Sequence, residues 1–361
     1  MNDFKAEPEA LKQEELVACE QVMRSGWYVL GREVEQFESR WAQCCGVDFG
    51  IGVGNGMDAI EIGLRALNVG PGDEVITTPM TAFATVLAIF RAGAIPVLAD
   101  IDATTALLDF ESVQRCLSPQ TKGILLVHLY GQMRSLGKWQ ALANAENIYL
   151  FEDCAQAHLA SWQGQRAGSL GAWGAYSFYP TKNLGAVGDA GIIVTNQAAI
   201  AHQAKVLRNY GQSERYHHDE IGLNSRLDEL QAALLTVRLA WLEKFTHRRC
   251  EIAQRYFADI QNPNIELLAP PIAPENHVYH LFVLKCAERD RLMQHLKSRE
   301  IASLCHYPVP IHRQPPCHDI HRDPQGLVVS ERYAQQCLSI PCHPQMSDRD
   351  VECVIEAVND F

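Results

Sequence analysis

The sequence has no uninterrupted apolar run long enough to cross a bilayer. A membrane-spanning helix needs about 18 or more apolar residues, and Arg91 interrupts the longest candidate, in residues 86–99. Residues 1–15 mix acidic residues with lysines and lack the apolar core of a signal peptide. We therefore expect a cytoplasmic protein that does not act in a membrane.

Excess positive charge is also missing. The chain has 31 Lys and Arg residues against 43 Asp and Glu residues, which gives a formal net charge of -12. Because nucleic-acid binding depends largely on neutralising phosphates with Lys and Arg, this composition argues against a nucleic-acid-binding protein. A local site for an anionic small molecule is still compatible with it.

Paired cysteine motifs are absent as well. The twelve cysteines include no Cys-x-x-Cys pair and are scattered between Cys19 and Cys353, which is typical of buried reduced thiols. Cys317, His318 and His321 have a spacing that could contact a metal, but no second pair of ligands lies nearby in the sequence. Because a structural metal site normally uses four ligands, we predict no metal centre.

The 361 residues, 47% hydrophobic and 20% charged, are enough for two globular domains. Short β-branched runs alternate with helix-like segments between Phe49 and Phe151. This alternation predicts an α/β fold with a mostly parallel sheet covered by helices. The expected strands are residues 50–53, 74–77, 95–99, 123–127 and 148–151, and the expected helices are residues 58–67, 82–92 and 135–145.

The second half of the chain indicates a smaller domain. A strand at 191–195 and a helix at 198–209 precede a long helical pattern that begins near Asp228 and continues toward Phe257. We expect this pattern to bend at residues 241–246, and we place there the boundary between a large domain, 1–243, and a smaller α+β domain, 244–361. In the smaller domain we expect strands at 280–285 and 302–306 and helices at 289–299 and 348–358.

Two polar residues follow apolar, strand-like runs. Lys182 lies in a turn rich in small residues, just after one such run. Asp153, earlier in the chain, ends another. A carboxylate at the end of a buried strand points into the crevice where α/β proteins bind ligands, and a semi-buried site makes a lysine nucleophilic. Such a pair suits pyridoxal phosphate (PLP), which bonds to a lysine and needs an acid at its pyridine nitrogen. The alternative for Lys182 is an ordinary surface lysine.

A glycine-rich segment, residues 52–59, offers a site for a phosphate. It combines a strand end, a turn and a helix start, the arrangement in which backbone N–H groups bind phosphate. It matches neither Gly-x-Gly-x-x-Gly nor Gly-x-x-x-x-Gly-Lys, so a dinucleotide site and a P-loop lose support.

In the order of Asp153 and Lys182 and in the motif at residues 177–191, the sequence resembles the DegT/DnrJ/EryC1/StrS family of sugar aminotransferases. The resemblance runs from Ser25 to about Val354. It implies a fold-type-I PLP enzyme of aspartate aminotransferase fold, in which Lys182 forms the Schiff base and carries protons and Asp153 accepts the pyridine N–H. It also implies cofactor contacts from the amides of Gly56 and Met57 and from Gln156, Ser177 and Asn224. The alternatives are a surface or capping amide for Gln156 and an ordinary strand-end serine for Ser177.

Two positions depart from the family pattern. Met57 stands where relatives usually carry a threonine, so a hydroxyl contact to the phosphate is lost. Ala82 stands where relatives usually carry an aromatic residue on the pyridine ring, and Phe83 is adjacent. Because one residue turns a helical side chain by about 100°, either the stacking is lost or the local backbone compensates.

The resemblance also implies a homodimer with shared active sites. Asn224 resembles an asparagine that reaches the phosphate of the neighbouring subunit's cofactor. Several side chains would bind the substrate: Trp27, Tyr28, Tyr179, Tyr210, His306 and Tyr307. Structural alternatives stay open for them: a glycine-closed helix end with core aromatics at residues 25–31, a structural histidine at 306, and a solvated charge cluster around residue 210.

The resemblance implies transfer of an amino group from an amino-acid donor, L-glutamate in most relatives, to a keto group of a nucleotide-linked sugar. The motifs are most similar to the branch that aminates dTDP-3-keto-6-deoxyhexoses, as in deoxysugar pathways such as that of lipopolysaccharide O-antigen. The alternatives are amination at C4, a UDP-linked substrate, or PLP-dependent dehydration, against which Lys182 argues. A non-catalytic regulator that keeps the fold is a further alternative, to which Met57 and Ala82 point.

Overall fold

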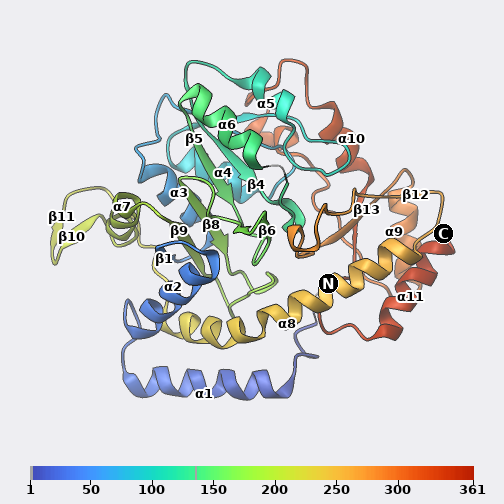
Figure 1. Ribbon diagram of the computed structural model, residues 1–361, viewed down its shortest axis with the longest axis horizontal. Helices are drawn as coiled ribbons and strands as arrows, with labels where there is room; N and C mark the ends of the chain where they lie inside the picture. The colour runs from blue at the N-terminus through green and yellow to red at the C-terminus, as the bar shows by residue number, and fades with distance from the viewer. Residues whose placement is uncertain (1–2, 135) are drawn as a thin grey trace.

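The computed structural model describes residues 3–134 and 136–361. Its largest element is an eight-stranded sheet in the order β1-β9-β8-β5-β4-β2-β3-β14 (Figure 1). Only β9 runs against its neighbours, so the expected mostly parallel sheet is confirmed. The strands are β1 (Phe49–Val53), β2 (Glu74–Thr77), β3 (Ile95–Leu98), β4 (Thr121–Val127), β5 (Tyr149–Asp153), β8 (Trp173–Ser177), β9 (Gly191–Thr195) and β14 (His321–Arg322).

Each face of this sheet has its own apolar core because side chains alternate along a strand. In β4, Ile124 and Leu126 join one core and Leu125 joins the other. The first core receives side chains from α2 (Arg32–Cys45), α5 (Phe110–Cys116), α6 (Leu136–Glu146) and the start of α8 (Glu229–Asp259). The second receives them from α3 (Gly56–Arg65), α4 (Phe83–Arg91) and α7 (Ala198–Arg208). The helices therefore lie on both faces.

Helix α8 connects the two parts of the molecule. It is continuous from Glu229 to Asp259, so the bend expected at residues 241–246 is wrong. The apolar face of α8 changes partner along its length: Leu235 and Leu242 pack against the large sheet, whereas Ile252 and Tyr256 pack in the C-terminal core. The division at 243/244 thus falls inside one helix. Helix α1 (Glu9–Ser25) lies alongside α8 (Figure 1).

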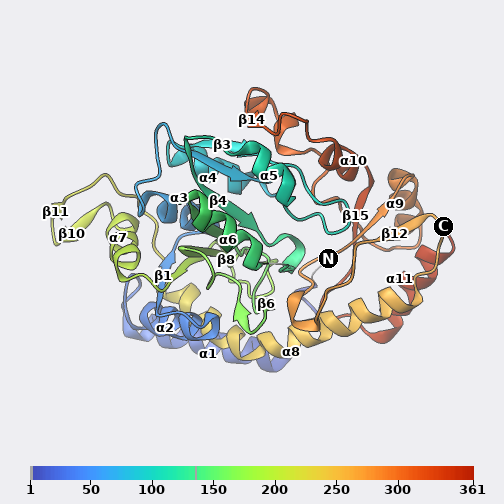
Figure 2. The same ribbon diagram turned by 45° about the horizontal axis from the view of Figure 1, so that its top comes forward.

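The C-terminal part is built on a small antiparallel sheet, seen beside α9 and α11 in Figure 2. Its strands are β12 (Ile265–Leu267), β13 (Phe282–Cys286) and β15 (Cys337–Ile340), and its helices are α9 (Arg289–Ser298), α10 (Val328–Gln336) and α11 (Asp348–Asn359). The strand expected at 302–306 is wrong, because only Leu304 forms a bridge, with Ser339. The fully buried β15 takes the place beside β13.

Two small hairpins and four short turns complete the fold. The hairpin of β10 (Gln212–Glu214) and β11 (His217–His218) projects beyond α7 (Figure 1), and a second joins β6 (Ser161–Trp162) to β7 (Gln165–Arg166). The 3-10 turns are Leu129–Gly131, Pro274–Asn276, Ile311–Arg313 and Pro315–Cys317. Within the described ranges, no helix combines the length and the apolar character that a membrane span requires.

Candidate active site

Asp153 ends β5 as a buried carboxylate held by two donors. Its Oδ1 accepts a hydrogen bond from the amide of Ala155 at 3.1 Å, and its Oδ2 accepts one from the Thr85 hydroxyl at 2.8 Å. Burial raises the pKa of Asp153 above its ordinary value, while the Thr85 bond, the Ala155 bond and the charge of Lys182 act in the opposite direction. The ionised form of Asp153 therefore depends on Thr85, Ala155 and Lys182, which oppose the effect of burial.

Lys182 lies close enough to Asp153 for the two charges to influence each other. It follows β8 through a tight turn, in which its amide donates to the carbonyl of Tyr179 at 2.8 Å. Burial lowers the pKa of Lys182 to about 8, and the attraction of Asp153 opposes part of that fall. With this pKa, about one tenth of the Lys182 amines is neutral, and nucleophilic, at pH 7, against less than about one in a thousand for an ordinary lysine.

The start of α3 and the end of β8 meet beside Lys182. A methyl group at Gly56 would lie 2.6 Å from the Cβ of Ser177, so only glycine allows this approach. The Asn55 side chain accepts from the amide of Asp58 at 2.9 Å, and the first amides of α3, at Gly56 and Met57, have no acceptor within the helix. These two amides and the Ser177 hydroxyl are the candidates for a cradle that would hold the phosphate of PLP.

The departure at Met57 leaves this cradle intact, whereas the one at Ala82 is not compensated. Met57 packs its side chain against the second core, and its amide stays at the helix start. Phe83 packs into a cluster with Val86, Leu98 and Ile311. The ring of Phe83 is therefore committed to that cluster and does not take over the stacking expected from position 82.

Gln156 connects the turn after β4 to a segment from the C-terminal part. Its Oε1 accepts from the amide of Tyr130 at 2.6 Å, and its Nε2 donates to the Tyr307 hydroxyl at 3.3 Å. The Tyr130 hydroxyl in turn donates to the carbonyl of His306. Burial raises the pKa of Tyr307 to about 12, and the negative charge of Asp153 adds to this rise.

Three histidines, His158, His280 and His306, feel the charge of Lys182, and burial together with that charge lowers the pKa of each, so they are neutral at physiological pH. His306 bonds the Ser339 hydroxyl at 2.8 Å, and burial and Lys182 lower its pKa to about 4. His158 bonds the carbonyl of Ser177 at 3.0 Å, and the same two causes lower its pKa to about 3. The sequence reasoning missed His158, although it lies in the same short run as Asp153 and Gln156.

The remaining expected site residues have exposed side chains in this chain. Gly26, with φ 66°, closes α1, which agrees with the first half of the structural alternative for residues 25–31. The second half is wrong, because Trp27 and Tyr28 are 62% and 55% exposed and lie outside the core. Tyr179 is exposed in the Lys182 turn, and Tyr210 is exposed and packs on Arg226. Asn224 is exposed, and its backbone forms a bridge with that of Asn209.

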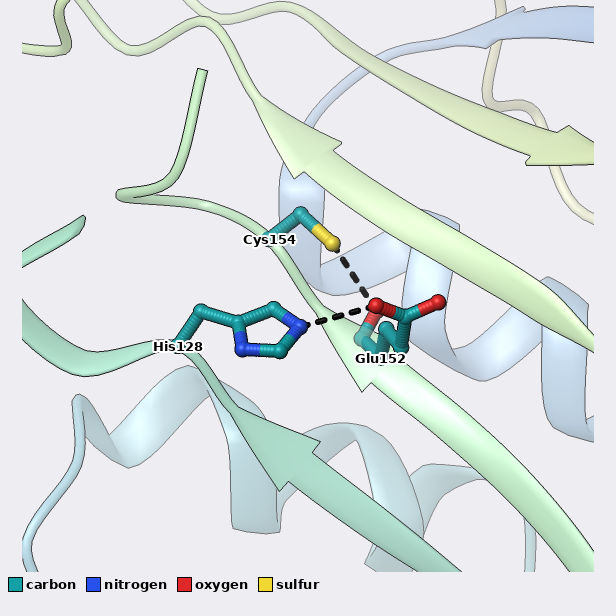
Figure 3. Close-up of side chains that lie close together, drawn as sticks. All are labelled: His128, Glu152 and Cys154. Carbon is teal, nitrogen blue, oxygen red and sulfur yellow. Dashed lines mark hydrogen bonds and ion pairs between the residues drawn. The ribbon is translucent and has the colours of Figure 1, made fainter. Parts of the chain in front are cut away.

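Figure 3 shows a buried cluster on the other face of β5, made of His128, Glu152 and Cys154. Glu152 accepts from His128 at 2.8 Å and from the amides of Gly168, Leu170 and Gly171 at 3.0, 2.8 and 3.0 Å. Burial alone would raise the pKa of Glu152, but the bonds from His128 and the backbone lower it. Because its oxygens are saturated with donors, the cluster is a structural anchor of β5.

Comparisons with known proteins identify the family of this chain. Residues 9–359 match the model of the DegT/DnrJ/EryC1/StrS aminotransferase family. The chain is 43% identical over 345 residues to a dTDP-3-amino-3,6-dideoxy-alpha-D-galactopyranose transaminase of Aneurinibacillus thermoaerophilus, covering 95% of this chain and 94% of that protein. It is 39% identical over 363 residues to a "Pleiotropic regulatory protein" of Geobacillus stearothermophilus, covering 100% and 98%.

A solved structure agrees over nearly the same length. The crystal structure of S. venezuelae DesV in complex with a ketimine intermediate superposes with a TM-score of 0.95 at 40% identity, covering 99% of this chain and 96% of that chain. The family match, the shared fold and the lysine–carboxylate pair beside a phosphate cradle lead to one assignment. The chain belongs to the DegT/DnrJ/EryC1/StrS aminotransferase family and is a PLP-dependent aminotransferase.

Proposed function

We propose that this aminotransferase moves the amino group of L-glutamate to the C3 keto group of a dTDP-linked 3-keto-6-deoxyhexose. The observation that carries the proposal is the pairing of Lys182, whose pKa burial lowers to about 8, with the buried Asp153 beside the helix start at Gly56. The printed name of the Aneurinibacillus relative, a dTDP-3-amino-sugar transaminase, supports this choice of sugar, nucleotide and carbon.

Each residue of the proposed site has a separate task. PLP supplies a reactive aldehyde and a ring that takes up electrons from the carbon that gains or loses a proton. Lys182 holds the cofactor covalently and, as a neutral amine, accepts and returns that proton. Asp153 keeps the pyridine nitrogen protonated, and Gly56, Met57 and Ser177 hold the phosphate.

We further propose a homodimer in which each active site is completed by the partner. Exposed apolar side chains lie on α1, on the loop after it and on the Lys182 turn, where a second copy of the chain would cover them. They are Leu16, Val17, Met23, Trp27, Tyr28, Tyr179 and Val187. In this arrangement Asn224 reaches the partner's cofactor phosphate, and Trp27, Tyr28, Tyr210, His306 and Tyr307 line the sugar cleft.

The cellular setting is part of the same proposal. All twelve cysteines are free thiols, which is compatible with the reducing cytoplasm, where we place the enzyme. We assign its product to an aminodeoxysugar pathway that supplies a surface polysaccharide such as lipopolysaccharide O-antigen.

Two alternatives remain: the same reaction on another substrate, and a protein without catalytic activity. Amination at C4, or of a UDP-linked sugar, needs only a different orientation of the sugar or another nucleotide in the same cleft. A non-catalytic regulator is suggested by the name of the Geobacillus relative and by Met57 and Ala82. The presence of Lys182 with a lowered pKa favours a catalyst.

Two measurements test the proposal. Borohydride reduction of the PLP-loaded protein, followed by peptide mass mapping, should place the cofactor on Lys182 and on no other lysine, with Lys182→Ala as the control. A panel of dTDP- and UDP-linked keto sugars, with product regiochemistry determined by NMR, should give 3-amino products from dTDP sugars. Turnover of 4-keto substrates alone would contradict the assigned carbon, and no turnover with any sugar would favour the regulator.

A further inference from the structure

We propose that Thr85, supported by Thr81, is the positioning residue that fixes the Asp153 carboxylate in its ionised form, aimed at the pyridine nitrogen. The inference rests on the proposed role of Asp153 and adds to it two residues at the start of α4. Neither belongs to the site residues expected from the sequence.

The two threonines meet where the chain enters α4. Thr85 lies in the first turn of the helix, and Thr81 precedes the N-cap residue, Ala82, so the entering chain turns the Thr81 side chain back toward that first turn. Both are almost completely buried, at 4% and 1% exposure. Their hydroxyls are 2.8 Å apart, and the Thr85 hydroxyl is 2.8 Å from Asp153 Oδ2. The three side chains therefore form one continuous chain of hydrogen bonds.

The donors and acceptors in this series of hydrogen bonds follow from the number of protons that each side chain carries. An ionised carboxylate only accepts, so the single hydroxyl proton of Thr85 is donated to Asp153. Thr81 must then donate its own proton to Thr85, and the two aligned bonds strengthen each other. The amide of Ala155 donates to the other oxygen, Oδ1, at 3.1 Å. Each oxygen thus has one fixed donor and keeps a free lone pair for the pyridine N–H.

The surroundings of Asp153 make these neutral donors important. The titratable side chains that feel its charge are Lys182, His128, Cys154 and Tyr307. Burial opposes the charged form of Asp153, and hydrogen bonds to a carboxylate favour it. The hydroxyl of Thr85 is the side-chain donor to this carboxylate among the described residues.

The test separates the hydroxyl from the volume of the side chain. Thr85→Val removes the hydroxyl and keeps the branched shape, Thr85→Ser keeps the hydroxyl, and Thr81→Val removes the second donor. Each protein is loaded with PLP labelled with ¹⁵N in the ring, and the ¹⁵N chemical shift reports whether the pyridine nitrogen is protonated. The dissociation constant of pyridoxamine phosphate, which binds without a covalent bond, is the second readout.

We expect Thr85→Val to move the ¹⁵N signal toward the unprotonated position and to weaken pyridoxamine phosphate binding about tenfold, the size expected for a lost bond to a charged group. Thr81→Val should give a smaller change of the same sign, and Thr85→Ser should match the wild type. Equal defects in Thr85→Ser and Thr85→Val, or no shift in either valine variant, would overturn the inference.

Asp153→Asn serves as the benchmark. If it shifts the ¹⁵N signal while both valine variants leave it unchanged, the threonine inference fails and the proposed role of Asp153 stands. If Asp153→Asn also leaves the signal unchanged, the proposed role of Asp153 fails first. Thermal unfolding of every variant shows whether a change in binding reflects a loss of the fold.

Discussion

At the residue scale, Lys182 is governed by two opposing influences. Burial disfavours its ammonium form, and the negative charge of Asp153 favours it; the balance puts the pKa of Lys182 at about 8. An ordinary lysine has a pKa of about 10.4. Because only the neutral amine attacks an aldehyde, the reactivity of Lys182 toward PLP should depend on pH in a range where other lysines are inert.

The first prediction follows for the cofactor-free protein. The rate at which Lys182 bonds covalently to added PLP should rise between about pH 7 and about pH 9, with a midpoint near the pKa of about 8. Asp153→Asn removes the charge that favours the ammonium, so its midpoint should move to lower pH. Stopped-flow absorbance measures both rates, and Lys182→Ala is the blank. A midpoint that moves to higher pH in Asp153→Asn would contradict the electrostatic account.

A second prediction concerns Glu152, whose carboxylate accepts four hydrogen bonds inside the protein. Glu152→Ala leaves His128 and three amides, one buried and two part-buried, without their acceptor, so the free energy of unfolding should fall by about 3–5 kcal/mol. Glu251→Ala is the matched control, because its pair with His247 is exposed, its pair with Arg248 is partly exposed, and such pairs contribute less than about 1 kcal/mol. Denaturant titrations measure both losses, and equal losses would show that Glu152 is no anchor.

At the scale of elements, the N-terminus of α2 is capped by a residue far away in the chain. Glu229, the first residue of α8, accepts from the amides of Gly31, Glu33 and Val34 at 2.8, 2.9 and 3.0 Å. These bonds fix the end of the loop that carries Trp27 and Tyr28. The amide of Glu229 also donates to the carbonyl of Tyr28 at 3.1 Å, so α8 holds the loop from both sides.

The third prediction tests this cap. Glu229→Ala should loosen the loop and raise the KM for the sugar substrate, by up to about fivefold if the roughly 1 kcal/mol of a lost helix cap is felt entirely at the substrate loop. PLP affinity should stay unchanged, because the phosphate cradle belongs to α3 and β8. Glu20→Ala, which removes an exposed pair with Arg24 on α1, is the control and should leave KM unchanged. A parallel loss of PLP affinity in Glu229→Ala would point to general disruption instead.

The elements also show where sequence reasoning succeeded and where it failed. Six strands of the large sheet end within a few residues of the expected positions, whereas β14 was not expected and β8 was expected only as an apolar run without bounds. The expected bend in α8 arose because its apolar face changes partner while its backbone continues. The site shows the same limit: Asp153 and Lys182 follow recognisable runs, whereas the bond from Thr85 to Asp153 joins positions 68 residues apart.

At the scale of the whole molecule, one chain contains only part of the expected active site. Asp153 lies at the carboxyl end of β5, Gln156 follows that strand and Lys182 follows β8, whereas Trp27, Tyr28 and Asn224 are exposed on the surface. A closed symmetric dimer presents the same patch from both subunits, so each chain can complete the partner's site. A shared site predicts that two inactive variants can complement each other, whereas a site contained within one chain does not.

The fourth prediction is complementation between two inactive variants. A heterodimer of Lys182→Ala and Asn224→Ala subunits has one site with both lesions and one intact site, so random reassociation of an equal mixture should restore about one quarter of the wild-type activity. A mixture of Lys182→Ala and Asp153→Ala is the control and should recover no activity, because these residues belong to the same chain's site. Activity is measured after dissociation and reassociation, with dimer formation followed by sedimentation. If the first mixture recovers no more than the control, Asn224 acts in its own subunit and the shared site is wrong.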